Sequence, residues 1–539
     1  MTLLVSIALV LVYNGQFWTT LLAELPGHSG RALLFTASFG VLLVVVFNLF
    51  LQLLPARAVL KPVLMLTVIS AALVSHFASS YGAIIDRHMI ASLLQTDFRE
   101  ARDLLGFGLV ARTCLLGVLP AVLIWFTPLK RQSWRRAALV RGGTIVSSGV
   151  VLALILSSLY QDYAFMLREH RELGQMVNPG AAILSAALYA LDEPLAAVPI
   201  KTVAGDVRRT VPANAGRKPM VIVLILGETA RADNFSLNGY PRTTNPELAA
   251  LPVISFSNVH SCGTSTAESV PCMFSHLGQS DFSVKAARTS ENLLDILKRA
   301  GLDILWIENN SGCKGVCDRV ATDKTSHAAD DALCPDGECQ DEIMLEPLRQ
   351  ALSRADDDLV VVMHQNGSHG PAYFRRYPPR FRAFLPACET SNIQSCSTDE
   401  IRSAYDNTIL YTDHVLAQVI ATLEARSEDI DAAMVYVSDH GESLGEANTW
   451  LHGLPYRIAP DVQKHVPMIM WSSGSYRTRQ HLDQNCLWAA RKDAITHDHL
   501  FHSVLGMLNV QTDVYEPRLD IFAQCRPTIP PALMAASGG

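Results

Sequence analysis

The chain has 539 residues, of which 49% are hydrophobic, and its formal net charge at pH 7 is −7. The mean hydropathy of +0.20 is high for a soluble protein, and the apolar excess lies in the first 160 residues. The length allows a membrane domain followed by one soluble domain of roughly 300 residues. The modest acidic charge argues against a nucleic-acid partner.

Five segments are long and apolar enough to cross a bilayer, which takes roughly 20 residues. They are Leu3–Ala23, Ala32–Leu54, Pro62–Ser80, Leu109–Phe126 and Gly142–Tyr160. A cleaved signal peptide is the alternative for the first, but no clean cleavage site follows it, and four more spans favour an uncleaved anchor. We therefore predict a five-span α-helical transmembrane domain over residues 1–160.

The basic loops predict the orientation of these spans. The loops between spans two and three and between spans four and five carry Arg57, Lys61, Lys130, Arg131, Arg135, Arg136 and Arg141. Basic loops stay in the cytoplasm, so both are predicted to be cytoplasmic. The loop at residues 81–108, and everything after the fifth span, then lies outside the cytoplasm.

The cysteines support this orientation. Ten of the eleven fall after residue 260, and eight form close-spaced pairs: Cys262 with Cys272, Cys313 with Cys317, Cys334 with Cys339 and Cys388 with Cys396. Such crowding is typical of an oxidising compartment. Cys486 and Cys525 allow a fifth pair, although a sequence does not fix connectivity. Zinc binding by thiolates is the alternative. Cys114 lies in a predicted span and is expected to be a free, buried thiol.

From Met220 onward, short apolar runs alternate with helical patterns. Strands are predicted at Met220–Leu226, Ile304–Glu308, Leu359–His364, Ala432–Ser438 and Val466–Trp471, and helices at Glu291–Ala300 and Thr398–Arg426. This alternation indicates a mostly parallel sheet covered by helices on both faces. We predict an α/β domain over residues 218–539, joined to the spans by a junction at 161–217 that contains an interfacial helix and a linker.

Two acidic motifs each follow a predicted strand. Glu228 stands in Leu226–Arg231, and Asp439 and His440 stand in Ser438–Ser443. Open α/β sheets place functional side chains just past the carboxyl ends of their strands. Two carboxylates and an imidazole suit a catalytic zinc with one open position, and manganese also fits this donor set. The alternative is that the carboxylates cap helices, but the two motifs together favour the metal.

Thr266, in the hydroxyl-rich segment 261–268, is the predicted nucleophile. Coordination to a divalent metal can lower the pKa of its hydroxyl. Ser265 and Glu268 match a capping box for a helix over Ala267–Leu277. Thr266 would then lie in the first turn, where backbone N–H groups favour an anion. The alternative is that these hydroxyls merely cap the helix.

Further candidates lie in glycine-containing loops. His369 and His452 could bind a phosphate, bind a second metal or protonate a leaving group; solvated surface is the alternative. Lys314 follows a predicted strand and could neutralise a phosphate, although its spacing alone favours an ordinary surface lysine.

Five motifs, in this order, resemble those of the bacterial lipid A phosphoethanolamine transferases, a family that includes the intrinsic and the mobile colistin resistance enzymes. The motifs are Leu226–Arg231, Ser261–Ala267, Gly367–Pro371, Ser438–Ser443 and Leu451–Pro455. The resemblance covers nearly the whole chain. A similarity to the sulfatase activation motif at Ser269–Met273 is superficial, because that motif has arginine where Met273 stands.

The resemblance implies an alkaline-phosphatase- or sulfatase-like catalytic domain after the transmembrane domain. It implies one or more zinc ions, held by Glu228, Thr266, Asp439 and His440. Thr266 would be the catalytic acceptor of phosphoethanolamine. His369 and His452 would be catalytic and would bind substrate phosphate or an additional zinc.

The resemblance also implies contacts with the donor lipid. The implied residues are Asn310, Ser311 and Lys314, together with Ser92, Thr96 and Glu100. The last three repeat every four residues, so one helical face carries all of them. The family often has asparagine where Ser92 stands.

The resulting prediction is a two-step transfer at the bacterial inner membrane, with the catalytic domain in the periplasm. Thr266 attacks the phosphorus of phosphatidylethanolamine, diacylglycerol leaves, and a lipid A phosphate then takes the phosphoethanolamine from Thr266. The new ammonium offsets a phosphate charge, so polymyxins should bind the outer membrane more weakly. The expected partners are the donor lipid, lipid A and the membrane, without nucleic acid, and the protein is expected to be a monomer.

Two rival functions differ in acceptor or in class. The chain could transfer phosphoethanolamine or phosphoglycerol to core sugars or periplasmic glucans. It could also be a membrane sensor or transporter, which predicts charged residues deep in the spans. Arg112 is the one charged residue inside a predicted span, and it lies near the end of that span.

Overall fold

The computed structural model describes residues 1–25, 30–54, 57–95, 104–129, 133–170, 172–192, 199–209, 217–325, 332–335 and 338–526. The chain divides into two compact units. One consists mainly of residues 1–91 and 104–193, and the other mainly of residues 194–447 and 451–539.

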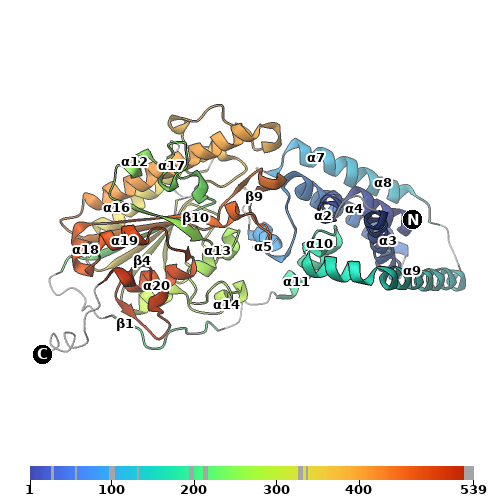
Figure 1. The fold of residues 1–539 in the computed structure, drawn as a ribbon, viewed down its shortest axis with the longest axis horizontal. Coiled ribbons are helices and arrows are strands. Elements are labelled where there is room, and N and C mark those ends of the chain that lie inside the picture. Colours follow the sequence, from blue (N-terminus) through green and yellow to red (C-terminus); the bar gives the residue numbers. More distant parts are fainter. Residues whose placement is uncertain are drawn as a thin grey trace. The chain divides into compact units, whose positions relative to one another are not determined.

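Helices make up the first unit (Figure 1). The helices up to residue 192 are α1 (Thr2–Val12), α2 (Gly15–Glu24), α3 (Gly30–Gln52), α4 (Arg57–Tyr81), α5 (Arg87–Gln95), α7 (Phe107–Thr113), α8 (Leu119–Phe126), α9 (Trp134–Glu169), α10 (Glu172–Gln175) and α11 (Gly180–Asp192). A π-helical turn at Cys114–Val118 joins α7 to α8.

Among the described residues, four helical stretches are long and apolar enough to cross a membrane. They are Gly30–Gln52, Val59–Tyr81, Phe107–Phe126 and Arg135–Tyr160. Helices α1 and α2 pass the same test only together, and they are bent by 59°. At that bend, the Asn14 side chain donates to the Leu9 and Asn178 carbonyl oxygens, each at 2.8 Å. The five predicted spans are therefore present if the bent pair counts as one.

Cys114 corrects one expectation for this unit. Its thiol is free, but it is exposed on the surface of the protein and not buried. The π-helical turn that it begins instead buries Gly117. A Cβ added at Gly117 would lie 3.3 Å from Ala72 and from Ile69 of α4, so this glycine allows the close packing of the two helices.

The second unit is built on an eight-stranded sheet with the strand order β11-β3-β10-β7-β2-β6-β4-β5. The strands are β2 (Met220–Gly227), β3 (Ile254–His260), β4 (Asp303–Glu308), β5 (Ala321–Lys324), β6 (Leu359–His364), β7 (Asp431–Ser438), β10 (His465–Ser472) and β11 (Ile495–Thr496). All neighbours pair in parallel except β10, which is antiparallel to both β3 and β7. The mostly parallel sheet is confirmed, and β3, β5 and β11 are strands that were not predicted.

Helices flank this sheet. They are α12 (Pro246–Ala249), α13 (Thr266–Met273), α14 (Val284–Arg288), α15 (Leu293–Arg299), α16 (Leu345–Ser353), α17 (Thr398–Glu424), α18 (Gly474–Gln480), α19 (Gln484–Ala490) and α20 (Asp498–Met507). In Figure 1, α17 and α20 lie on opposite faces of the sheet. Short strands β1 (Arg208–Arg209) and β12 (Val510–Gln511) pair beside the main sheet.

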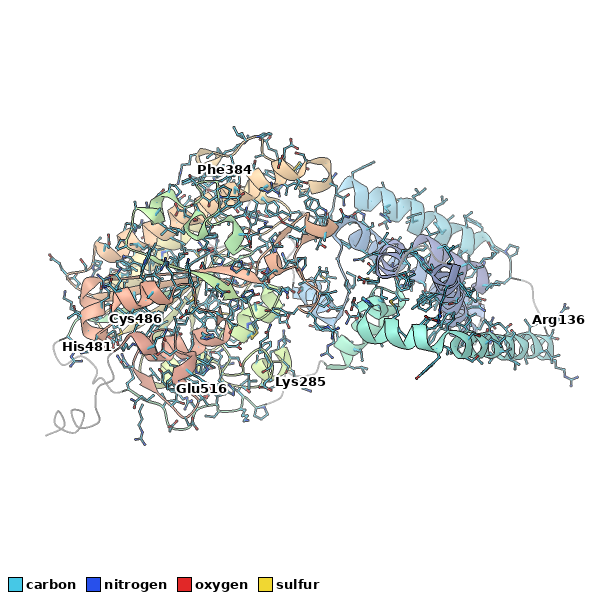
Figure 2. The ribbon with its side chains drawn as sticks, in the orientation of Figure 1. Arg136, Lys285, Phe384, His481, Cys486 and Glu516 are labelled. Carbon is cyan, nitrogen blue, oxygen red and sulfur yellow. A yellow bond between two sulfur atoms is a disulfide. The ribbon has the colours of Figure 1, made fainter. Side chains whose placement is uncertain are left out.

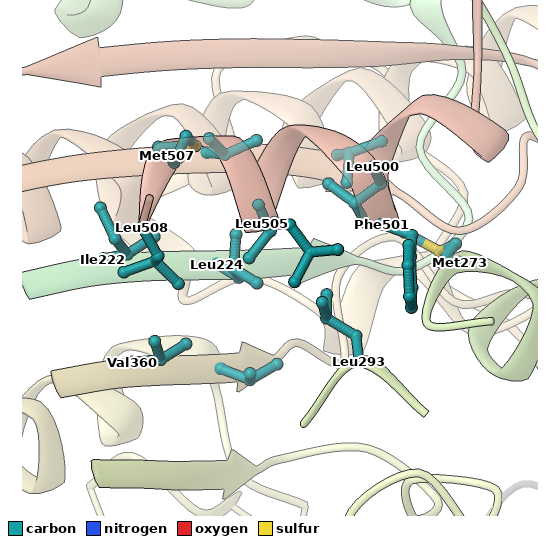
Figure 3. Close-up of a cluster of buried hydrophobic side chains, with 14 of the residues drawn as sticks. Ile222, Leu224, Met273, Leu293, Val360, Leu500, Phe501, Leu505, Met507 and Leu508 are labelled. Carbon is teal, nitrogen blue, oxygen red and sulfur yellow. The ribbon is translucent and has the colours of Figure 1, made fainter. Parts of the chain in front are cut away.

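The largest core cluster lies between α20 and the sheet. Ile222 and Leu224 of β2 point toward Leu505 and Leu508 at the end of α20 (Figure 3), and all four side chains are at most 1% exposed. Because side chains alternate along a strand, the intervening Val223 faces the opposite layer, where it is also buried. Strand β2 is buried on both faces, which explains its continuous apolar sequence.

Five disulfides tie the loops of the second unit. They join the four close-spaced pairs and also Cys486, labelled in Figure 2, to Cys525. The Cys262–Cys272 bridge spans the turn into α13. The prediction of disulfides in an oxidising compartment is thus supported by pairings that bring every predicted partner together.

Candidate active site

The carboxyl ends of the central strands meet at one edge of the sheet. Strands β7, β2, β6 and β4 are parallel neighbours, and Gly227 at the end of β2 pairs with Ser438 at the end of β7. His364 at the end of β6 lies between Leu226 and Glu308 in the same register. Strand β3 runs in the same direction as β7, because β10 is antiparallel to both. The segments that follow these strands therefore converge at one place.

Glu228, Asp439 and His440 come together at this edge. Each is fully buried, and one ligand atom from each lies within 4.8 Å of the others. The His440 Nε2 atom is 3.3 Å from Glu228 Oε1 and 3.3 Å from Asp439 Oδ2. The His440 Nδ1–H donates to the Gly441 carbonyl oxygen at 2.9 Å, which directs the Nε2 atom toward the two carboxylates.

The backbone after β2 is strained where it presents Glu228. Thr229 has a φ of 60°, which is rare for a β-branched residue. Its N–H donates to Asp439 Oδ1 at 3.1 Å, and its carbonyl oxygen accepts from the Tyr405 hydroxyl at 2.7 Å. Strain of this kind persists only where the surroundings over-determine it, and it clusters at functional sites.

Thr266 reaches the same cluster from another strand. It is the first residue of α13, and its Oγ1–H donates to Glu228 Oε2 at 3.0 Å. The same oxygen is 3.4 Å from His440 Nε2. Ser265 occupies the expected cap position, but its side chain makes no cap hydrogen bond with the described residues. The predicted capping box is therefore wrong, and α13 ends at Met273 rather than Leu277.

The charges of this cluster are unbalanced. Burial would raise the pKa of Glu228, but the hydrogen bond and the charge of His440 hold it well below its usual value. Burial and the nearby Glu228 charge raise the pKa of Asp439 to about 6. Burial would lower the pKa of His440, but Asp439 and Glu228 raise it to about 10. A divalent cation between the carboxylates would offset this negative charge.

A second observation supports a metal ion at Glu228, Asp439 and His440. Asp439 Oδ2 is buried and, apart from its ion-pair contact with His440 Nε2 at 3.3 Å, has no hydrogen-bond partner within the part of the chain that the structure describes. A buried carboxylate oxygen without a hydrogen-bond donor is costly unless it is paired or coordinates a metal. Two carboxylates, an imidazole and the Thr266 hydroxyl suit zinc. These residues could therefore hold one zinc ion.

His369 and His452 flank the cluster. The His452 ring centroid is 4.3 Å from that of His440 and 5.6 Å from that of His369. Burial lowers the pKa of His369 to about 3, so its imidazole is neutral. The structure thus brings both predicted histidines beside the predicted ligands.

Glu442 fixes the orientation of His452. It is fully buried; its Oε2 accepts from His452 Nδ1 at 2.8 Å, and its Oε1 accepts from the Tyr373 hydroxyl. This pairing leaves Nε2 of His452 for substrate or metal. Sequence reasoning missed Glu442, although it stands in the Ser438–Ser443 motif, because its partners lie in other segments.

We expect Glu442→Gln to lower kcat by about 10- to 100-fold, because loss of a group that hydrogen-bonds to a metal-binding histidine typically lowers activity by this factor. An amide in place of the carboxylate can no longer accept from both His452 and Tyr373. Tyr373→Phe removes one of these donors and should cost less. Steady-state transfer assays check both, and equal kcat for Glu442→Gln and the wild type would contradict the assigned role.

The loop that carries His369 is held by Asp341. The Asp341 carboxylate is buried and accepts from the backbone N–H groups of Asn366 and Gly367, each at 2.9 Å. Gly367 has a φ of +54°, and a Cβ there would lie 2.7 Å from the Glu228 carbonyl oxygen. Only glycine fits this close approach.

Gly367→Ala is expected to destabilise the protein by about 2 kcal/mol or more, from backbone strain plus the overlap with Glu228. Gly301→Ala is the matched control, because Gly301 also has a positive φ, of +82°, but a Cβ there would meet nothing within 4 Å. Thermal unfolding of both variants separates the two contributions. An equal shift in Tm for both would contradict the overlap.

Asn310, Ser311 and Lys314 lie in the loop after β4. The Asn310 Nδ2 atom donates to Glu228 Oε2 at 2.7 Å and to the Gln365 carbonyl oxygen at 2.8 Å, so this side chain also positions Glu228. The Lys314 Nζ donates to Ser311 Oγ at 2.9 Å. The structure thus places this loop next to the cluster, with Lys314 half-buried rather than on an open surface.

The loop before α7 is described only in part. Ser92 lies on α5, whereas Thr96 and Glu100 lie outside the described residues.

Sequence reasoning also missed the pairing of Glu308 with His364. The His364 Nδ1 atom lies 3.1 Å from Glu308 Oε1, both side chains are buried, and Glu308 also accepts from the Asn310 N–H.

Comparisons with known proteins identify the family of both units. A family model described as Phosphoethanolamine transferase EptA/EptB matches residues 43–193, and one described as Sulfatase matches residues 220–510. In this chain, Cys272, the cysteine of the sulfatase-like segment, is bonded to Cys262.

Individual proteins match over most of the chain. Phosphoethanolamine transferase EptA of Escherichia coli K12 is 38% identical over 526 residues, which cover 97% of this chain and 96% of that protein. Phosphatidylethanolamine transferase Mcr-1 of Escherichia coli is 40% identical over 475 residues, or 86% of each chain. The solved structure of the lipooligosaccharide phosphoethanolamine transferase EptA of Neisseria meningitidis is 35% identical, covers 98% of each chain and gives a TM-score of 0.94.

Relatives of this identity cover both the helical unit and the sheet-containing unit, so the similarity is not confined to one part of the molecule. The helical apolar unit and the alkaline-phosphatase- or sulfatase-like α/β unit are those of one enzyme family. The chain therefore belongs to the EptA and Mcr family of phosphoethanolamine transferases.

Proposed function

We propose that the chain transfers phosphoethanolamine from phosphatidylethanolamine to a lipid A phosphate through a covalent intermediate on Thr266. The observation that carries the proposal is the position of Thr266. Its hydroxyl lies at the N-terminus of α13, 3.0 Å from Glu228 and next to the buried pair Asp439 and His440. A nucleophile, a base and a helix N-terminus that favours an anion are therefore in one place.

Glu228, Thr266, Asp439 and His440 would hold a zinc ion, and a further zinc beside His369 and His452 remains part of the proposal. When bound, zinc lowers the pKa of a coordinated hydroxyl and neutralises charge on a phosphoryl group. The buried Asp439 oxygen that accepts no hydrogen bond and the unbalanced charge support this assignment.

The first step uses residues already in contact. The Thr266 Oγ–H proton passes to Glu228 Oε2, its present acceptor, while Oγ forms a bond to phosphorus. The bond from phosphorus to the diacylglycerol oxygen breaks, and His452 supplies the proton that this oxygen gains, whereas the neutral His369 contacts the phosphate. The products are diacylglycerol and phosphoethanolamine on Thr266.

The second step reverses the roles. An oxygen of a lipid A phosphate attacks the phosphorus and gives its proton to His452, the bond to Thr266 Oγ breaks, and Oγ regains its proton from Glu228. We assign Asn310, Ser311 and Lys314 to the phosphate of the donor, because Lys314 supplies a cation next to Glu228 and Asn310. Ser92, Thr96 and Glu100 are assigned to its ethanolamine group.

The same proposal includes the location and the consequence of the reaction. The proposed location is the bacterial inner membrane, with the α/β domain in the periplasm, where the donor lipid and lipid A are both available. The apolar helices and the disulfides support this location. The protein acts as a monomer. Each transfer adds an ammonium to lipid A and so weakens the attraction of cationic polymyxins.

Mass spectrometry of lipid A tests the proposal. Polymyxin-sensitive Gram-negative cells that express the chain should contain lipid A heavier by one phosphoethanolamine group, and cells that express Thr266→Ala at the same level should not. Unmodified lipid A in both would move the acceptor to core sugars or periplasmic glucans. Modification by both proteins would exclude Thr266 as the nucleophile.

A further inference from the structure

A buried histidine outside the reaction scheme connects two halves of the active site. His497 caps α20 next to β11 and is 2% exposed. Its Nδ1 accepts from the Cys262 backbone N–H at 3.1 Å, and its Nε2–H donates to the Ser438 carbonyl oxygen at 2.9 Å. An amide can only donate and a carbonyl can only accept, so these bonds select one neutral tautomer. Burial lowers the pKa of His497 to about 3, in agreement with a neutral ring.

Both partners adjoin groups of the proposed chemistry. Cys262 begins the turn that leads to Thr266 and is bonded to Cys272 at the far end of α13. Ser438 directly precedes Asp439 and His440, and its hydroxyl also accepts from the Ala230 N–H and donates to the His440 carbonyl oxygen. One imidazole thus joins the nucleophile segment to the ligand segment.

The attachment of His497 is itself rigid. The backbone N–H of His497 donates to the His260 carbonyl oxygen at 3.0 Å, and this hydrogen bond fixes His497 to the end of β3. The next residue, Asp498, accepts from the Gln279 N–H at 2.9 Å, and the Gln279 side chain donates to the Cys262 carbonyl oxygen at 2.7 Å. Cys262 is therefore held on both its N–H and its C=O side.

We propose that His497 is a positioning residue that holds the Cys262–Thr266 segment against Ser438–His440 at the distance that the transfer requires. The inference rests on the proposed function of Thr266 as nucleophile. A misplacement of about 1 Å in a reacting group can cost 10²-fold in rate, so the loss of the two hydrogen bonds that join these segments is sufficient to slow the transfer.

Three substitutions distinguish the contributions of the two hydrogen bonds that the His497 ring makes with Cys262 and Ser438. His497→Asn places an amide oxygen near the position of Nδ1 and can keep the bond from Cys262. His497→Gln places an amide nitrogen near the position of Nε2 and can keep the bond to Ser438. His497→Ala loses both. Full-length proteins in detergent are assayed for transfer from fluorescent phosphatidylethanolamine and for zinc affinity by competition with a chelator.

We expect kcat to fall by about 10-fold in each amide variant and by about 100-fold in His497→Ala, with the KM of the donor changed by less than about twofold. Zinc affinity should fall most in His497→Asn and His497→Ala, which free the segment of the ligands Asp439 and His440, and less in His497→Gln, which frees the segment of the single hydroxyl ligand Thr266. A purely structural role would not produce this split.

His502→Asn is the matched control. His502 lies on the same helix, is 3% exposed, and accepts from the Glu516 N–H at 3.1 Å, away from the cluster. It should lower Tm comparably while leaving kcat and zinc affinity unchanged. Wild-type kcat in the His497 variants, or a loss no greater than in His502→Asn, would overturn the inference. Turnover by Thr266→Ala would overturn the proposed function instead, and the zinc affinities would still decide the role of His497.

Discussion

Thr266→Ala is expected to lower the rate of transfer by on the order of 10⁴-fold or more, because removal of the proposed nucleophile eliminates the proposed covalent route altogether. The change should leave the fold intact. Thr266 begins α13, where alanine is also accommodated, and the core of this helix consists of other residues, among them Val270 and Met273.

Thr266→Ser separates the hydroxyl from the methyl group. Serine keeps the Oγ that now donates to Glu228, so activity should return to within about 10-fold of wild type. Incubation of the wild type with the donor lipid alone should yield a peptide that carries phosphoethanolamine on Thr266. Thr289→Ala is the control, because the Thr289 hydroxyl donates only within α14 and its end. A labelled peptide from Thr266→Ala would place the intermediate on another residue.

The strands that carry the site could be predicted from sequence because they are apolar throughout. The predicted Met220–Leu226, Leu359–His364 and Ala432–Ser438 agree with β2, β6 and β7 to within one residue at each end. A strand that is buried on both faces is a continuous apolar run without polar–apolar alternation. Its short length and its β-branched residues identify it as a strand.

Strand β3 was missed for the opposite reason. Its sequence, Ile254–His260, contains two serines, an asparagine and a histidine, and three of its seven residues are only partly buried. This is the strand that delivers Thr266. The hydroxyl-rich turn could be recognised, but its approach to Glu228 depends on pairing between β3 and β10, which is a property of the fold and not of either segment.

The partners of the site residues were equally hidden. In sequence, His497 is 235 residues from its partner Cys262 and 59 residues from Ser438. Glu442 accepts a hydrogen bond from Tyr373, which is 69 residues away. Each of these residues is unremarkable in its own segment. Their roles follow from buried polar atoms that must be satisfied, which a single sequence does not reveal.

Glu228→Gln should abolish most of the zinc-dependent stabilisation of the protein. The substitution keeps the shape but removes the charge that faces His440, and it replaces one of the oxygens that accept from Thr266, Asn310 and Thr229. A loss of about 100-fold in zinc affinity corresponds to about 2.7 kcal/mol less stabilisation at a saturating zinc concentration. We expect transfer to fall by on the order of 10³-fold, since both the metal and the proton acceptor of Thr266 are impaired.

Thermal unfolding with and without added zinc measures this effect directly, and metal content after dialysis against a chelator measures it independently. Glu346→Gln, on the exposed side of α16, makes the same chemical change away from the cluster and should alter neither quantity. If Glu228→Gln showed the same rise in Tm with zinc as the wild type, zinc would bind elsewhere. The carboxylate of Glu228 would then serve only as the hydrogen-bond acceptor of Thr266, and the variant would still lose activity because the hydroxyl would lack its base.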